Sequence, residues 1–208
     1  MIEDSQVEDA LSRLKKEKEE AMKEGKVYSL TKYIRIIDMY HKEKVDVSKD
    51  TEFQRVYNGF FLTAPTRKAF RDAYYECMKN RKKDRKLLIE TVLEDLYDEN
   101  VKRVEASYAS KMLSVINPQR PVLDSFVINN LNAYENVGIE PIKPHDPVEK
   151  RIANRVAAYK KICNWYKNHF KSGEAAKWIE LFDKSFPEFK NKISEVKKID
   201  LILWKIRK

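Results

Sequence analysis

Residues 87–96 read LLIETVLEDL, and the spacing of their apolar side chains indicates how the chain folds. Leu88, Val92 and Leu96 recur at intervals of four, with Leu87 and Leu93 beside them and acidic residues between. Such spacing places the apolar side chains on one face of an α-helix. The same 3.6-residue period recurs in nearly every segment, so it predicts an all-α fold.

The composition supports long helices joined by short loops. The chain has 208 residues but only four Gly and seven Pro, while 36% of its residues are charged and 11% are aromatic. A sequence rich in turns and short strands would contain more Gly and Pro. A chain of this length buries roughly 70% of its unfolded surface, so it needs no disulfide or metal to fold. We expect a compact bundle of roughly ten helices.

The apolar pattern and the breaks within it define the expected helices and loops. Ser48 is a candidate N-cap for a helix that contains Phe53 and Phe60. The longest irregular stretch, residues 135–147, contains Gly138 and three prolines. Residues 1–208 therefore form either one domain or two helical subdomains that meet near 135–147. The expected helices cover about 5–24, 30–40, 49–60, 67–79, 87–96, 101–116, 125–134, 148–170, 174–183 and 190–206.

Several classes of protein have no support in the sequence. Cys77 and Cys163 are isolated, and no Cys/His cluster has metal-ligand spacing, so we expect no metal and no cofactor. The first residues are polar and acidic, unlike a signal peptide. No apolar run approaches the roughly 20 residues of a membrane span. The expected location is therefore cytoplasmic.

One constellation carries candidate chemistry. Residues 105–113 read EASYASKML, and residues 121–127 read PVLDSFV. Small residues precede Lys111, an apolar helical stretch follows it, and Asp124 begins the next helix after a short apolar run. This layout resembles the core of the helix-hairpin-helix DNA glycosylase superfamily over about 30 residues.

The resemblance implies specific roles for four residues. Lys111 corresponds to the catalytic lysine of that superfamily and Asp124 to its catalytic aspartate. Ser107 and Ala109 fall where the superfamily has the two hairpin glycines that approach a DNA phosphate. The interval from Lys111 to Asp124 is shorter than in the superfamily by about five residues, as judged from the motif.

Such a pair can cleave a glycosidic bond. A deprotonated amine attacks the sugar C1′, displaces the base and forms a Schiff base. Burial near other cations, for which Arg103 and Arg120 are candidates, lowers the pKa of a lysine. A carboxylate stabilises the oxocarbenium-like transition state, and the target base must first leave the duplex.

Both residues also have a structural interpretation. Asp is a preferred N-cap, and Asp124 stands where a helix begins. Lys111 can simply extend toward solvent. In that case the chain is a non-enzymatic helical interaction or accessory protein, and Lys111 and Asp124 only stabilise the fold.

The charge balance suggests a nucleic-acid partner. The net charge is +9, and the densest basic region contains the candidate phosphate-contacting residues Arg67, Lys68, Arg71, Arg81, Lys82 and Lys83. Basic clusters of this kind bind the backbone of double-stranded DNA, although a solvated helix face has the same composition. The sequence therefore predicts a DNA-binding helical protein of glycosylase-like architecture, either active or inactive.

Overall fold

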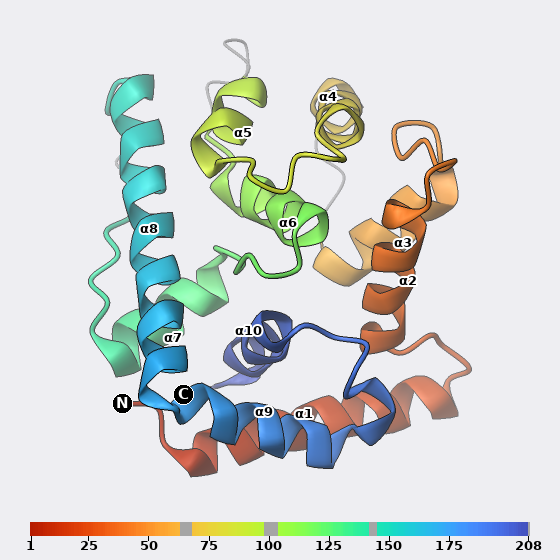
Figure 1. Cartoon of the computed structure of the whole chain (residues 1–208), viewed down its shortest axis with the longest axis vertical. Coiled ribbons are helices and arrows are strands. Elements are labelled where there is room, and N and C mark those ends of the chain that lie inside the picture. Colours follow the sequence, from red (N-terminus) through yellow and green to blue (C-terminus); the bar gives the residue numbers. More distant parts are fainter. Residues whose placement is uncertain (63–67, 98–103, 142–144, 208) are drawn as a thin grey trace.

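A computed structural model describes residues 1–62, 68–97, 104–141 and 145–207, and every regular element within them is a helix (Figure 1). The prediction of an all-α fold is therefore confirmed for the described residues. They form ten α-helices and one 3-10 helix: α1 (Asp4–Lys23), α2 (Ser29–His41), α3 (Thr51–Phe61), α4 (Lys68–Asn80), α5 (Ile89–Asp95), α6 (Ala106–Ile116), α7 (Ser125–Glu135), α8 (Val148–Ser172), α9 (Glu174–Ser185), η1 (Pro187–Phe189) and α10 (Glu195–Lys205).

The two ends of the chain pack together. Helix α1 contacts both α9 and α10, and α10 also contacts α7 (Figure 1). Lys205 near the C-terminus forms an ion pair with Glu17 of α1, and Lys18 pairs with Glu188 of η1. Helix α10 therefore lies in the interior, with helices from both halves of the sequence around it.

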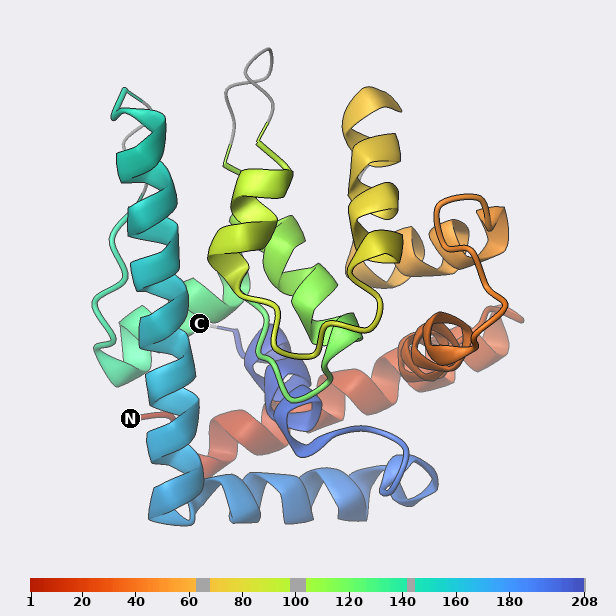
Figure 2. The ribbon, with the colours of Figure 1, turned by 45° about the horizontal axis from the view of Figure 1, so that its top comes forward.

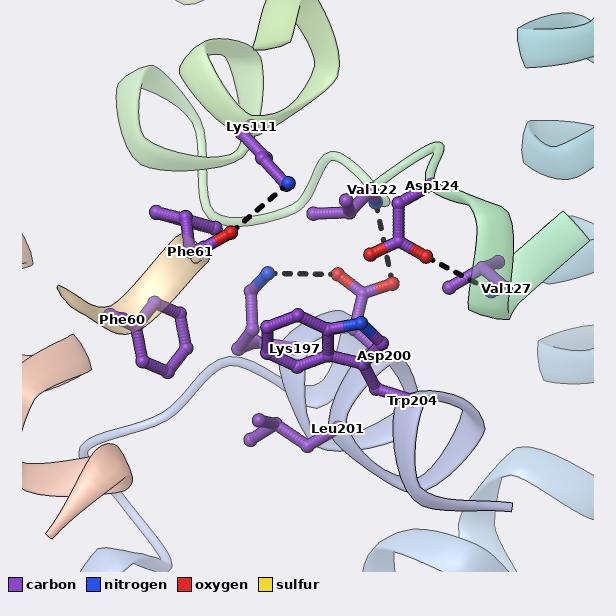
Figure 3. Close-up of a pocket in the computed structure, with 10 residues that line it drawn as sticks. All are labelled: Phe60, Phe61, Lys111, Val122, Asp124, Val127, Lys197, Asp200, Leu201 and Trp204. Atoms are coloured by element: carbon purple, nitrogen blue, oxygen red, sulfur yellow. Dashed lines mark hydrogen bonds and ion pairs between the residues drawn. The ribbon is translucent and has the colours of Figure 1, made fainter. Parts of the chain in front are cut away.

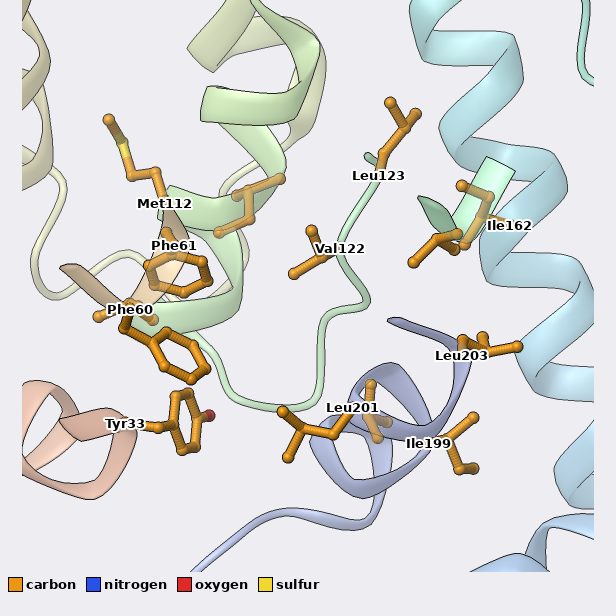
Figure 4. Packing of buried hydrophobic residues seen from close by; sticks show 14 of the residues in the cluster. Tyr33, Phe60, Phe61, Met112, Val122, Leu123, Ile162, Ile199, Leu201 and Leu203 are labelled. Atoms are coloured by element: carbon orange, nitrogen blue, oxygen red, sulfur yellow. The ribbon is translucent and has the colours of Figure 1, made fainter. Parts of the chain in front are cut away.

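The middle of the chain forms the other walls of the molecule. Helix α6 contacts α5 and α2, and α2 packs against α3. The longest helix, α8, runs along one side of the molecule and contacts α5 and α9 (Figure 2). Buried hydrophobic residues from both sides of 135–147 belong to one continuous cluster, part of which Figure 4 shows.

Several details of the helices differ from the expectations. Helices α6 and α10 begin at Ala106 and Glu195, about five residues after the expected starts near 101 and 190. Asp50, rather than Ser48, caps α3 by accepting a hydrogen bond from Phe53 N at 2.8 Å, whereas the Ser48 hydroxyl donates to Asp46. Helix α5 begins at Ile89, which is buried, whereas Leu88 is 58% exposed. Leu88 is the N-cap of α5 and has extended backbone angles, so its side chain does not share the helical face of Val92.

Candidate functional site

Lys111 lies in the second turn of α6, inside the molecule. Its side chain is only 8% exposed, and its Nζ donates a hydrogen bond to the carbonyl oxygen of Phe61 at 3.1 Å. Phe61 is the last residue of α3, where carbonyl groups lack partners within the helix. A cation at this end also interacts favourably with the helix dipole. The expected extension of Lys111 toward solvent is therefore wrong.

Asp124 is the N-cap of α7, as its structural interpretation predicted. One carboxylate oxygen accepts a hydrogen bond from Val127 N at 3.0 Å, and the residue is 7% exposed. The second carboxylate oxygen points into a cavity that Lys111 also lines (Figure 3). The cap therefore occupies one oxygen of Asp124 and leaves the other available to the cavity.

A cavity of about 20 Å³, room for roughly one water molecule, lies between α3, α6, α7 and α10. Its apolar wall includes Phe60 and Trp204, and its polar lining consists of two lysines and two aspartates (Figure 3). Lys111 forms no ion pair shorter than 4.0 Å with any residue in the described part of the chain. The amine and the Asp124 carboxylate therefore face the same space without direct contact.

Ser110 holds the connector between α6 and α7 in place. The buried Ser110 hydroxyl accepts a hydrogen bond from Leu123 N at 2.9 Å. Ser110 precedes Lys111, and Leu123 precedes Asp124. The contact therefore returns the chain along α6 and brings the two candidate residues to one cavity. Ser110 was not among the candidate site residues, because a serine within a helical stretch has no distinctive pattern in the sequence.

An ion pair on α10 completes the polar lining. Lys197 Nζ lies 2.9 Å from an Asp200 carboxylate oxygen, and their side chains are 3% and 5% exposed. Asp200 also accepts hydrogen bonds from the Tyr166 hydroxyl and, at 3.4 Å, from Val122 N. The Lys197 ammonium lies 5.6 Å from the centre of the Phe61 ring. The helix expected over about 190–206 contains both Lys197 and Asp200, but neither was among the candidate site residues.

Burial shifts the protonation of both candidate residues toward neutrality. Desolvation lowers the pKa of Lys111, and the opposing attraction of Asp124 is smaller. Desolvation likewise raises the pKa of Asp124, against the hydrogen bond from Val127 and the attraction of Lys111. A lysine must lose its proton to act as a nucleophile, so the environment of Lys111 favours that role.

Ser107 and Ala109 lie within α6 and not in a hairpin that precedes it, so the implied hairpin position is wrong. Ala109 is fully buried, and its side chain cannot contact a phosphate. Ser107 is half-buried and lines a surface pocket between α6, α7 and α8, called here the α6–α7 pocket. Asp124 lines both this pocket and the interior cavity.

The candidate basic residues of α4 interact with a neighbouring carboxylate. Lys68 Nζ lies 2.7 Å from Asp72, and Arg71 approaches the same carboxylate at 3.9 Å. Both pairs are exposed to solvent. Arg67 lies outside the described residues.

The basic residues after α4 differ in whether their side chains are free to contact a binding partner. Arg81 forms an ion pair with Asp95 at 2.9 Å, and Lys82 donates to the carbonyl oxygens of Lys42 and Val45 at 2.6 and 3.1 Å. Lys83 is exposed. Two of these three side chains therefore hold loops of the protein itself, and Lys83 is the best placed to reach a partner.

Other kinds of site are not visible in the residues described. Within these residues no group of three or more His, Cys, Asp or Glu side chains could hold a metal ion, and Cys77 and Cys163 are both free thiols. No helix in the described part of the chain is long and apolar enough to cross a membrane. The chain matches no protein-family model, no curated protein and no solved structure.

Proposed function

We propose that the protein binds double-stranded DNA and that Lys111 and Asp124 form a base-excision site of the DNA glycosylase type. One observation supports this proposal above the others. The amine and the carboxylate come from two different helices, yet both face one cavity (Figure 3). A purely local role for each residue does not require this convergence.

The proposed chemistry uses the two groups in different ways. The neutral Lys111 nitrogen attacks C1′ of the sugar, and the bond from C1′ to the base breaks as the bond to nitrogen forms. The electron pair leaves with the base, which takes up the proton that the Lys111 nitrogen loses. The C1′–O4′ bond then breaks as the nitrogen lone pair forms the C=N bond, and O4′ takes up a proton from water, which gives a protonated Schiff base. The uncapped oxygen of Asp124 stabilises the positive charge that develops on the sugar.

A second candidate function also has a specific observation in its favour. Lys111 and Asp124 are 8% and 7% exposed, and each already makes a hydrogen bond that stabilises the fold. These features suit a non-enzymatic DNA-binding or accessory protein in which the pair is structural. A flipped base could reach the Lys111 amine only if the cavity opened toward the DNA.

Borohydride trapping distinguishes the two candidates. Labelled duplexes, each with one damaged base, are incubated with the protein and reduced, and a covalent complex is detected on a denaturing gel. We expect a complex with at least one lesion, which Lys111→Met abolishes. Lys167→Met is the matched control, because Lys167 is an exposed lysine on α8 outside every candidate site.

Wild-type protein that binds duplex DNA but traps none of the lesions supports the non-enzymatic alternative. Circular dichroism of Lys111→Met establishes that the variant is folded before its loss of trapping is interpreted.

A further inference from the structure

The α6–α7 pocket lies on the surface side of Asp124 and has a volume of about 410 Å³. Its walls include the first residues of α6 and α7 together with two arginines of α8, Arg151 and Arg155. The two arginines are four residues apart, so both occupy one face of α8. None of these features was part of the candidate site that the sequence predicted, apart from Ser107 and Asp124.

Arg155 carries a half-buried positive charge without a counterion. Its guanidinium forms no ion pair with any carboxylate in the described part of the chain, and its Nε is buried without a hydrogen-bond partner. Burial lowers the pKa of Arg155, with no opposing contribution from an acidic group. By contrast, Arg81 and Arg55 each form ion pairs, with Asp95 and Glu52.

An unpaired, partly desolvated charge reduces the stability of a folded protein. Because this charge lies beside an open pocket, an anionic ligand in the pocket can pair with it and offset part of that loss of stability. A guanidinium binds phosphate through two parallel hydrogen bonds, and this geometry makes arginine the preferred side chain for phosphate recognition.

The helix termini add to the positive potential of the pocket. Helix α6 begins at Ala106 without a side-chain cap, so its first N–H groups lack that partner. Helix α7 begins at Ser125, and its Asp124 cap accepts only from Val127 N. The positive ends of two helix dipoles therefore meet at the pocket that Arg155 lines. Glu105 and Asp124, which also line the pocket, are the opposing acidic residues.

We infer that the α6–α7 pocket binds a phosphate group of a double-stranded DNA backbone and that Arg155 is its main charged contact. This inference rests on the proposed DNA-binding function, and it names the surface that the backbone contacts. Asp124 connects the two sites, since it lines the phosphate pocket on one side and the Lys111 cavity on the other. A phosphate held here lies beside Asp124, one member of the candidate catalytic pair.

Salt-dependent DNA binding tests the role of Arg155. Fluorescence anisotropy of a labelled duplex is measured over a series of salt concentrations for the wild-type protein, Arg155→Gln, Arg155→Lys and Lys167→Gln. Lys167 is an exposed lysine further along α8, so its substitution removes the same charge from the same helix away from the pocket.

We expect Arg155→Gln to weaken binding roughly 5- to 10-fold and to reduce the salt slope by about one, as loss of one phosphate contact predicts. Arg155→Lys should keep the slope but bind more weakly than wild type, because an ammonium cannot form the paired contact. Lys167→Gln should bind like wild type. Unchanged affinity and slope for Arg155→Gln, in a protein that binds DNA, would overturn the inference and leave the proposed function standing.

A second measurement does not depend on DNA binding. Inorganic phosphate should raise the melting temperature of the wild-type protein and not that of Arg155→Gln, because a ligand stabilises only the fold that binds it. If phosphate acts in this way but the protein binds no duplex, the backbone of DNA is the wrong source of the phosphate. No phosphate effect on the wild-type protein would count against the site itself.

Discussion

The Ser110 hydroxyl accepts a hydrogen bond from the backbone N–H of Leu123 at 2.9 Å, in the interior of the protein. This contact joins the second turn of α6 to the last residue before the Asp124 cap of α7. The backbone of the connector is thereby held close to α6, although α6 and α7 are separate elements. The positions of Lys111 and Asp124 at one cavity depend on this contact.

Ser110→Ala should destabilise the protein by about 1–3 kcal/mol, because it leaves a buried N–H group without its partner. Urea unfolding measures the change. Ser114→Ala is a matched control, since Ser114 is also buried in α6 but donates to the Lys111 carbonyl of its own helix. That substitution leaves no N–H of the connector unpaired, so it should cost less. Equal losses for the two variants would show that the contact with Leu123 has no special role.

Removal of one member of the buried ion pair on α10 should strongly destabilise the protein. Asp200→Ala removes the partner of Lys197 and the acceptor of the Tyr166 hydroxyl, both in the interior. Breaking a buried pair on one side costs about 3–5 kcal/mol, because the remaining charge is left uncompensated. The free energy of unfolding in urea checks this value. Glu180→Ala removes one partner of an exposed pair on α9 and should have little effect.

Lys111 should give the stability of the protein a distinctive pH dependence. Burial lowers the pKa of Lys111 below its ordinary value of 10.5. Between the lowered value and 10.5, the unfolded chain retains a proton that the folded protein has released. The contribution of Lys111 to the free energy of unfolding therefore rises with pH across that window.

Comparison with Lys111→Met isolates this contribution from those of the buried tyrosines. The difference in free energy of unfolding, wild type minus variant, should increase as pH rises toward 10.5. Urea unfolding at several pH values measures it. A difference that does not change with pH would mean that the Lys111 pKa is not lowered.

Some features of the fold followed directly from the sequence. The 3.6-residue apolar period located each helix, because burial of one face is the main requirement for a helix in a globular protein. Helix starts were harder to assign. Ser48 and Asp50 are both good caps and lie two residues apart, and only the backbone geometry determines that Asp50 accepts from Phe53 N.

The candidate site was predicted in part. Lys111 and Asp124 stood out because of their spacing and their apolar neighbours. Lys197 and Asp200 did not, because opposite charges three residues apart on a helix are usually an exposed pair. The burial of Lys197 and Asp200 depends on helices from both ends of the chain that surround α10. The residues next to them in the sequence do not specify which helices pack there.

The basic segment after α4 remains a second predicted DNA contact. Lys83→Gln should reduce the salt slope of duplex binding by about one if its ammonium neutralises a phosphate. Arg81→Gln should instead act through the fold, since it breaks the ion pair with Asp95 that joins the residue after α4 to α5. Anisotropy and thermal melting of both variants separate the two effects. A wild-type slope for Lys83→Gln would exclude this residue from the DNA interface.

Two substitutions of Asp124 separate its structural role from its proposed chemical role. Asn is as good an N-cap as Asp, so Asp124→Asn should preserve the hydrogen bond from Val127 N and most of the stability of α7. Asp124→Ala removes the cap and should cost about 1 kcal/mol. The Asn variant also removes the charge whose attraction opposes the fall in the Lys111 pKa. Its lysine should therefore be at least as readily deprotonated as that of the wild type.

The effect of Asp124→Asn on the rate of base excision distinguishes the two proposed functions. If Asp124 stabilises the developing charge on the sugar, Asp124→Asn should reduce the rate of borohydride-trapped complex formation by 100-fold or more, on the order of the loss from one electrostatic contact in a transition state. DNA affinity and melting temperature should change little in the same variant. A stable Asp124→Asn protein that traps at the wild-type rate would assign Asp124 to the helix cap alone, and base excision by this pair would then have to be abandoned.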